Sequence, residues 1–150
     1  SVFGRDFTSA TVSAAGVPLP TVLDGVSVEL DDGTETRPVP VLFVSPGQIN
    51  AQLPFDAPPS LAVRVRNPAG VSEADAIQLV ERAPRVFTQE GAPLVFHADF
   101  TRVTEAAPAE PGETLVAYLT GLGAVDPPVP AGDVPGEALS TVTVRNPTLS

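Results

Sequence analysis

The alternation of apolar and polar residues predicts a series of β-strands in the first half of the chain. In residues 25–30, every second position is apolar, so that one face of an extended segment is valine and leucine and the other is polar. Asp31-Asp32-Gly33 follows, and its glycine suits the positive φ of a tight hairpin turn. We therefore predict a half-buried strand at 25–30 with residues 39–44 as its hairpin partner.

The same alternation continues beyond this hairpin. Residues 49–53 alternate between aliphatic side chains and amides until Pro54, which cannot donate to a sheet ladder. Residues 61–66 alternate again, and the turn sequence Asn67-Pro-Ala-Gly70 leads into a further apolar segment at 74–80. The pattern predicts a short strand followed by a second hairpin.

Beyond residue 84 the apolar segments become shorter, until Thr114–Thr120, which is apolar on both faces. Such a segment is typical of a central strand covered on both sides. We predict a β-sandwich over residues 1–84 and a second β-rich unit over 85–150. A proline-rich joint at 106–112 and a boundary at 81–84 are both compatible with the pattern, as is one large sandwich over the whole chain.

Composition narrows the fold to the all-β class. Hydrophobic residues make up 43% of the chain and charged residues 17%, which indicates a packed core. The 18 prolines rarely leave ten consecutive residues free, and a proline inside a helix costs about 3 kcal/mol. Long helices are therefore excluded, and antiparallel sheet is favoured.

Charge and cysteine content exclude several classes of partner. The net charge is −10, without a basic stripe to offset it, so neither nucleic acid nor an anionic membrane surface is an expected partner. No apolar run of about 18 residues predicts membrane insertion, and no signal peptide is expected in this segment. The absence of cysteine excludes a disulfide scaffold and thiolate metal sites.

Several motifs in order along the chain resemble the Solibacter C-terminal domain, an uncharacterised family at the C-termini of secreted acidobacterial proteins. The eleven-residue run Val44-Ser-Pro-Gly-Gln-Ile-Asn-Ala-Gln-Leu-Pro54 is the most specific of them. The others are Leu23–Val28, Ala83–Thr88, His97–Asp99, Pro108–Glu113 and Thr120–Ala124. The resemblance covers roughly residues 1–140 and implies a secreted or cell-surface bacterial protein.

That family looks related to the immunoglobulin-like IPT/TIG sandwiches. Phe3-Gly-Arg-Asp-Phe7 is similar to their opening Gly-x-x-Phe element, and residues 115–123 loosely echo residues 2–7. The resemblance implies an immunoglobulin-like sandwich followed by a second, incomplete copy. An incomplete copy exposes a sheet edge, which further sequence or a neighbouring subunit could cover. We therefore expect inter-subunit strands at Val2 and Phe3 and at Val142 and Val144.

Candidate metal sites are sparse. His97 and Asp99 would share one face of a strand, but no second His or any Cys exists to complete a transition-metal site. Asp31–Glu35 places three carboxylates around a turn and could hold Ca²⁺, although the hairpin already explains Asp-Gly. Further aspartates at turns leave calcium open at an inter-domain joint: Asp24, Asp56, Asp75, Asp126 and Asp133.

The remaining candidate is a row of amides. Gln48, Asn50 and Gln52 present amide groups from one short segment, and such groups can bind sugar hydroxyls or simply bond the local backbone. No nucleophile motif accompanies them. We predict a non-catalytic structural module that assembles with copies of itself or with adjacent domains through β-strand pairing outside the cell. The alternative is a carbohydrate-binding or adhesive accessory module that takes extracellular polysaccharide.

Overall fold

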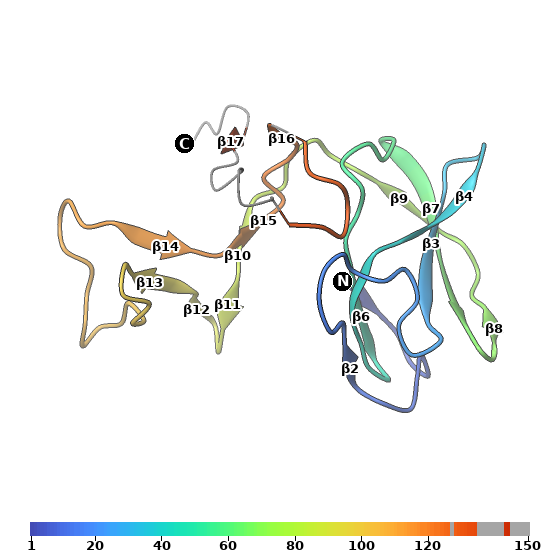
Figure 1. The fold of residues 1–150 in the computed structure, drawn as a ribbon, viewed down its shortest axis with the longest axis horizontal. Helices are drawn as coiled ribbons and strands as arrows, with labels where there is room; N and C mark the ends of the chain where they lie inside the picture. The colour runs from blue at the N-terminus through green and yellow to red at the C-terminus, as the bar shows by residue number, and fades with distance from the viewer. Residues whose placement is uncertain (127, 135–142, 145–150) are drawn as a thin grey trace. The chain divides into compact units, whose positions relative to one another are not determined.

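The computed structural model describes residues 1–126, 128–134 and 143–144 of the chain. Every regular element in these ranges is a β-strand, and every pairing is antiparallel (Figure 1), which confirms the all-β prediction. No helix long and apolar enough to cross a membrane occurs in these ranges. The described residues form two compact units, Ser1–Val80 with the residues from Ala124 onward, and Glu81–Gly123.

The first unit contains two antiparallel sheets. One has the strand order β1-β6-β5-β2 and consists of β1 (Val2–Phe3), β6 (Gln48–Ala51), β5 (Val41–Val44) and β2 (Val12–Ser13). The other has the order β4-β3-β7-β8, with β9 paired to β7; its strands are β4 (Thr36–Val39), β3 (Ser27–Asp31), β7 (Ser60–Asn67), β8 (Gly70–Val71) and β9 (Asp75–Gln78).

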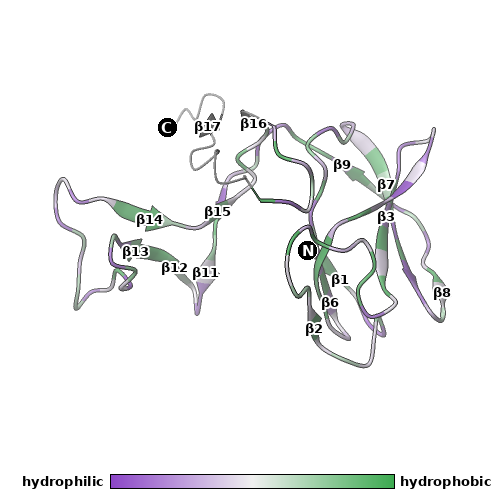
Figure 2. Ribbon diagram, viewed as in Figure 1, coloured by the Kyte–Doolittle hydropathy of each residue, from purple (hydrophilic) through white to green (hydrophobic). Residues whose placement is uncertain are grey.

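One hydrophobic core joins these two sheets. The centre of this core is formed by every second residue of β3 together with the residue just before the strand, because successive side chains of a strand point to opposite faces. These are the residues predicted to be buried, with exposed fractions of 0% for Val26, 2% for Val28 and 3% for Leu30. Figure 2 shows apolar colouring on parts of β3 and β6, two of the strands that contribute to this core. The other buried aliphatic residues are Val39, Val41, Val44, Ile49, Leu61 and Val65.

The prediction that residues 39–44 as a whole pair with residues 25–30 was wrong. Only β4, up to Val39, pairs with β3, whereas β5, from Val41, belongs to the other sheet. Pro40 separates them because it has no N–H to continue the first ladder. The chain therefore crosses between sheets here, with both flanking valines in the core.

The predicted turns are confirmed. Gly33 has φ +87°, and its N–H donates to a carboxylate oxygen of Asp31 over 2.9 Å. In the second hairpin, Asn67 Oδ1 accepts hydrogen bonds from the N–H groups of Ala69 (3.0 Å) and Gly70 (3.1 Å). A side-chain oxygen thus replaces a backbone carbonyl in the turn, as expected for asparagine.

The second unit is built from two-stranded ribbons. They pair β10 (Arg85–Val86) with β15 (Leu119–Thr120), β11 (Thr88–Gln89) with β12 (Ala92–Pro93), and β13 (Val95–His97) with β14 (Leu115–Ala117). No residue between 81 and 123 is fully buried. One further ribbon, β16 (Val125–Asp126) with β17 (Thr143–Val144), belongs to the first unit.

The expectation of a central strand at 114–120 was wrong. The segment is divided at Tyr118, where the chain changes partner, and β14 and β15 each pair with a single strand. Tyr118 accepts a hydrogen bond from Phe87 N–H over 2.9 Å, and its ring meets that of Phe96 edge-on at 5.7 Å. The segment is apolar on both faces, yet Leu115 and Leu119 stay about two-fifths exposed.

Candidate functional site

β1 is an open edge strand of the four-stranded sheet in the first unit. Val2 lies opposite Ile49, Phe3 lies opposite Gln48, and the N–H of Gly4 donates to the carbonyl of Gly47 over 3.1 Å. Bonded and non-bonded positions alternate along an antiparallel ladder, so the N–H and C=O of Phe3 point away from β6. Neither group has a partner among the described residues, and the Phe3 side chain is 74% exposed.

The local sequence holds β1 in this position. The ring of Phe7 packs over Gly4 so closely that a Cβ on this glycine would lie 2.5 Å from it. Phe7 also packs against the core, and its N–H donates to the carbonyl of Pro46 over 3.3 Å. The Gly-x-x-Phe spacing therefore ties the segment after β1 to the turn before β6.

A cleft of about 350 Å³ opens beside β1, between the two sheets. Its walls are mainly aliphatic and include Val2 from β1, Val28 from β3, Val65 from β7 and Ile77 from β9. The acidic residues Glu73 and Asp75 also line it. An apolar cleft beside an open strand edge is the geometry that accepts an added strand, because backbone bonds and side-chain burial are then gained together.

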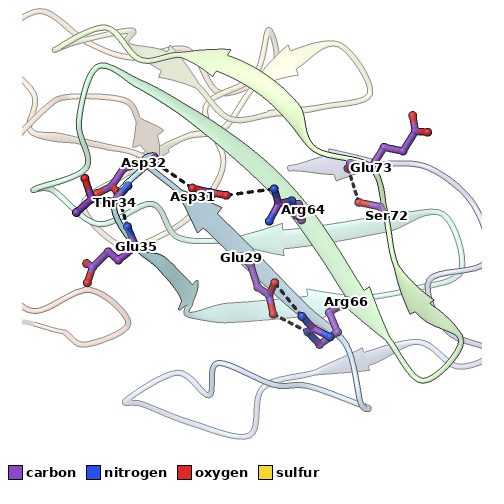
Figure 3. A network of polar contacts seen from close by, with 10 residues as sticks. Glu29, Asp31, Asp32, Thr34, Glu35, Arg64, Arg66, Ser72 and Glu73 are labelled. Atoms are coloured by element: carbon purple, nitrogen blue, oxygen red, sulfur yellow. Dashed lines mark hydrogen bonds and ion pairs between the residues drawn. The ribbon is translucent and has the colours of Figure 1, made fainter.

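The two acidic residues carry no compensating cation. Neither carboxylate has a hydrogen bond or ion pair within the described part of the chain. Their contacts are made by the backbone: the carbonyl of Glu73 accepts from the Ser72 hydroxyl over 2.8 Å, and Asp75 lies opposite Val63 in the β7–β9 ladder. Figure 3 shows the Glu73 side chain pointing away from the neighbouring strands. The residues that line the cleft therefore include aliphatic side chains and two acidic residues whose carboxylates have no cation partner in the described part of the chain.

The second predicted inter-subunit strand, at Val142 and Val144, is described only in part. Val144 lies in β17, opposite Val125, while Val142 falls outside the described residues.

Two other sheet edges of the first unit differ from β1 in their side chains. Strand β4 contains Pro38, and proline at a sheet edge hinders the addition of another strand. The edge strand β9 carries Asp75 on its cleft side. In β1 neither residue is proline or charged, which is also true of the edge strands β2 and β8, but the cleft opens beside β1.

The amide row is largely occupied by local bonds. Gln48 Nε2 donates to Asn50 Oδ1 over 2.8 Å, and that same oxygen accepts from the Ser1 hydroxyl over 2.8 Å. Gln52 Oε1 accepts from the N–H of Gly132 over 2.8 Å. Gln48 Oε1, Asn50 Nδ2 and Gln52 Nε2 have no partner within the described residues, so one acceptor and two donor groups of the amide row remain free.

The acidic turn is organised by its own backbone and by arginines (Figure 3). Asp32 Oδ1 accepts from the N–H groups of Thr34 (2.8 Å) and Glu35 (2.9 Å), and the bond from Glu35 in particular lowers the pKa of the Asp32 carboxyl. Asp31 forms an ion pair with Arg64 at 3.1 Å. Two of the three carboxylates are therefore engaged within the hairpin or across β3 and β7.

A second ion pair between these strands lies farther from the turn, toward the start of β3. Arg66 Nε donates to Glu29 Oε1 over 2.6 Å and Nη2 approaches Oε2 at 3.4 Å, a two-pronged contact. The bond with Glu29 raises the pKa of Arg66, which stays charged at any ordinary pH. Glu29 and Arg64 are also direct cross-strand neighbours. Charge on this face of the sheet is thus locally balanced.

Three of the other turn aspartates have partners of their own. Asp24 accepts from the Thr8 hydroxyl, Asp56 forms an ion pair with Arg37 at 3.1 Å, and Asp133 Oδ1 accepts from the N–H of Val134 over 2.8 Å. Asp126 belongs to β16. In the described ranges, no three His, Asp or Glu groups lie close enough together to hold a metal ion.

His97 has a partner that the sequence analysis missed. Asp99 does not continue strand β13; it lies in the turn after it, where its carboxylate accepts from the backbone and hydroxyl of Thr101 at 2.9 and 2.6 Å. His97 Nδ1 instead contacts the Glu113 carboxylate, and Nε2 lies 3.2 Å from the carbonyl of Ala107. The bond with Glu113 raises the pKa of His97.

This arrangement has a simple chemical consequence. The carboxylate of Glu113 and the carbonyl of Ala107 are both acceptors, so the imidazole of His97 satisfies both only when both of its nitrogens carry a proton. Glu113 Oε2 also accepts from the N–H of Glu110 over 2.9 Å, the main reason for its lowered pKa. The imidazolium therefore fastens the 104–113 loop to β13.

Comparison with known proteins gives no relative for this chain. No family model matches the sequence, and neither a curated protein nor a solved structure is significantly similar to it.

Proposed function

We propose that this chain is a non-catalytic structural module of a secreted or cell-surface bacterial protein, which assembles with copies of itself through β-strand pairing. The observation that carries the proposal is the β1 edge, where the outward N–H and C=O of Phe3 lie beside an apolar cleft. An open edge of this kind is a template for another strand. Phe3 adds an aromatic ring exposed over 74% of its surface.

The finer fold assignment belongs to the same proposal. Two antiparallel sheets around one core, with Phe7 packed on Gly4 at the first strand, support an immunoglobulin-like sandwich of the IPT/TIG type. The resemblance of Val44–Pro54 to the Solibacter C-terminal domain supports the extracellular location and the bacterial source. In this proposal the chain works without a metal or a cofactor.

Sedimentation velocity over a wide concentration range, followed by electron microscopy, tests self-association. We expect the wild-type chain to form oligomers or strings. Phe3→Pro should reduce them strongly, because proline removes the outward N–H while the bonds to β6 use Val2 and Gly4. Leu42→Ser, at a half-exposed position of the interior strand β5, is the matched control. A wild-type chain that stays monomeric at high concentration would refute the proposal.

We propose carbohydrate binding as the second function, on a narrower basis. Gln48 Oε1 and Asn50 Nδ2 remain unpaired within the described residues and face the same side of β6. Amides of this type can bond sugar hydroxyls. A glycan array with the wild-type chain and with Asn50→Ala tests it: binding that Asn50→Ala abolishes supports a lectin-like role, and a blank array rejects it.

A further inference from the structure

The strand that completes the β1 edge can be sought in the second unit of the chain. Strand β10 pairs with β15 through Arg85↔Thr120 and Val86↔Leu119, and Phe87 N–H bonds the Tyr118 carbonyl at the next position. By the alternation of the antiparallel ladder, the N–H and C=O of Val86 point away from β15. Within the described residues neither has a partner, so β10 offers the same kind of open edge as β1.

The side chains of β10 match the surroundings of β1. Val86 is 42% and Phe87 51% exposed. Arg85 is also exposed, and its guanidinium has no hydrogen bond or ion pair in the described part of the chain. The cleft beside β1 has aliphatic walls and the uncompensated carboxylates of Glu73 and Asp75. The β10 edge thus has exposed apolar side chains and an arginine without an ion pair, whereas the β1 edge lies beside an apolar cleft lined by acidic residues without an ion pair.

We infer that β1 of one copy pairs antiparallel with β10 of a second copy, with Phe3 directly opposite Val86. In this register each of these two residues donates its N–H to the other's carbonyl, as a hydrogen-bonded pair does. The inference rests on the proposed self-assembly and names the segment that performs it. The contact is heterologous, because β1 and β10 are different surfaces, and repetition of such contacts gives rings or filaments.

The register also fixes which side chains enter the cleft. Val2 packs against the core and lines the cleft, so the residue opposite it lies on the same face. In the proposed pairing this is Phe87 of the second copy, and Arg85 lies on that face two positions away. Phe87 is thus placed beside the aliphatic cleft, and Arg85 lies on the core-facing side of its sheet, the side on which Asp75 of the opposite sheet lines the cleft.

Disulfide trapping tests the register, because the chain has no cysteine of its own. Pairs of single-cysteine variants, one partner carrying a size tag, are mixed, oxidised and separated without reductant. Directly opposite residues have Cα atoms about 4.5–5.5 Å apart, within the range of about 4.4–6.8 Å that a disulfide spans. We expect rapid links for Phe3→Cys with Val86→Cys and for Val2→Cys with Phe87→Cys.

The matched control is shifted by one residue. Phe3→Cys with Phe87→Cys places the two sulfurs on opposite faces, so its link should form at least about tenfold more slowly. Equal rates for all pairs, or a faster link of Phe3→Cys with itself, would overturn the inference. Circular dichroism of each variant establishes that it is folded before mixing.

Sedimentation separates failure of this inference from failure of the proposed function. Val86→Pro should reduce wild-type association as strongly as Phe3→Pro, and the double variant should show no further loss, because both remove the same contact. Arg85→Gln should weaken association up to about fivefold, as for an exposed ion pair. Association that depends on Phe3 but not on Val86 would retain the proposed function and reject β10 as the donor, whereas a monomeric wild type would reject both.

Discussion

Replacement of Ile49 by alanine tests the two-sheet core and its separation from the second unit. Ile49 is fully buried in β6, opposite Val2 of β1 and Val44 of β5. The change removes three carbon atoms, which at about 0.8 kcal/mol per buried CH₂ contributes about 2.4 kcal/mol. The cavity left behind extends the expected loss to about 2–5 kcal/mol. Since a domain of this size is stabilised by about 5–15 kcal/mol, the effect is large.

Urea unfolding followed by two signals measures this loss. Far-ultraviolet circular dichroism reports both units, whereas the single tyrosine, Tyr118, gives fluorescence from the second unit only. Ile49→Ala should lower the midpoint of the dichroism transition and leave the fluorescence transition in place. Leu42→Ala, at a position 50% exposed, should cost less than about 1 kcal/mol.

Two results would refute this reasoning. A loss below about 1 kcal/mol for Ile49→Ala would mean that the side chain is not enclosed between the sheets, because full burial and partial relaxation alone predict more. An equal shift of the Tyr118 fluorescence transition would mean that the chain unfolds as one cooperative body, and not as the two units that its contacts define.

Two further predictions concern the second unit. The raised pKa of His97 means that its bond to Glu113 stabilises the fold fully below the ordinary histidine pKa of 6.5. This contribution is lost as the pH rises through the higher pKa of the folded state. An NMR titration of the single histidine should show the raised pKa, and Glu113→Gln should lower it. Gly121→Ala should destabilise the second unit strongly, because φ is +73° and the new Cβ would lie 2.1 Å from the Ala83 carbonyl oxygen. Gly112→Ala is the control, with φ +86° and open space around the new Cβ, and should cost only about 1 kcal/mol. Urea unfolding monitored through tyrosine fluorescence measures both variants.

The sequence predicts the first unit well where a local pattern determines burial. The alternation in residues 25–30 corresponds to β3 and the residue before it, with Val26, Val28 and Leu30 buried as the period of two in a strand requires. It does not predict that β5 leaves the sheet of β4. Pro40 marks the interruption, but which sheet receives the next strand depends on pairing with β6, and no local signal specifies that partner.

The residues of the candidate site, too, were predictable only where a local sequence pattern marks them. Val2 and Phe3 are predicted as an inter-subunit strand because an incomplete set of strands exposes a sheet edge, and both residues lie in the edge strand β1. The contact of His97 with Glu113 joins residues sixteen apart through a turn and a loop, so neither spacing nor strand periodicity indicates it. Asp99 was the nearer candidate by sequence, but the chain turns at Phe100, with φ +65°, and Asp99 leaves the strand.

Self-assembly also bears on how the second unit stays folded. Isolated two-stranded ribbons are marginally stable in water, and residues 81–123 form three such ribbons without one fully buried side chain. The Phe96–Tyr118 contact and the His97 bonds hold neighbouring segments, but they enclose little apolar surface. If β10 adds to β1 of a second copy, Val86 and Phe87 gain the burial that the ribbons do not provide. Association would then stabilise the second unit more strongly as the concentration rises, with the logarithm of concentration once it exceeds the dissociation constant, so assembly and folding of this unit would be linked by mass action.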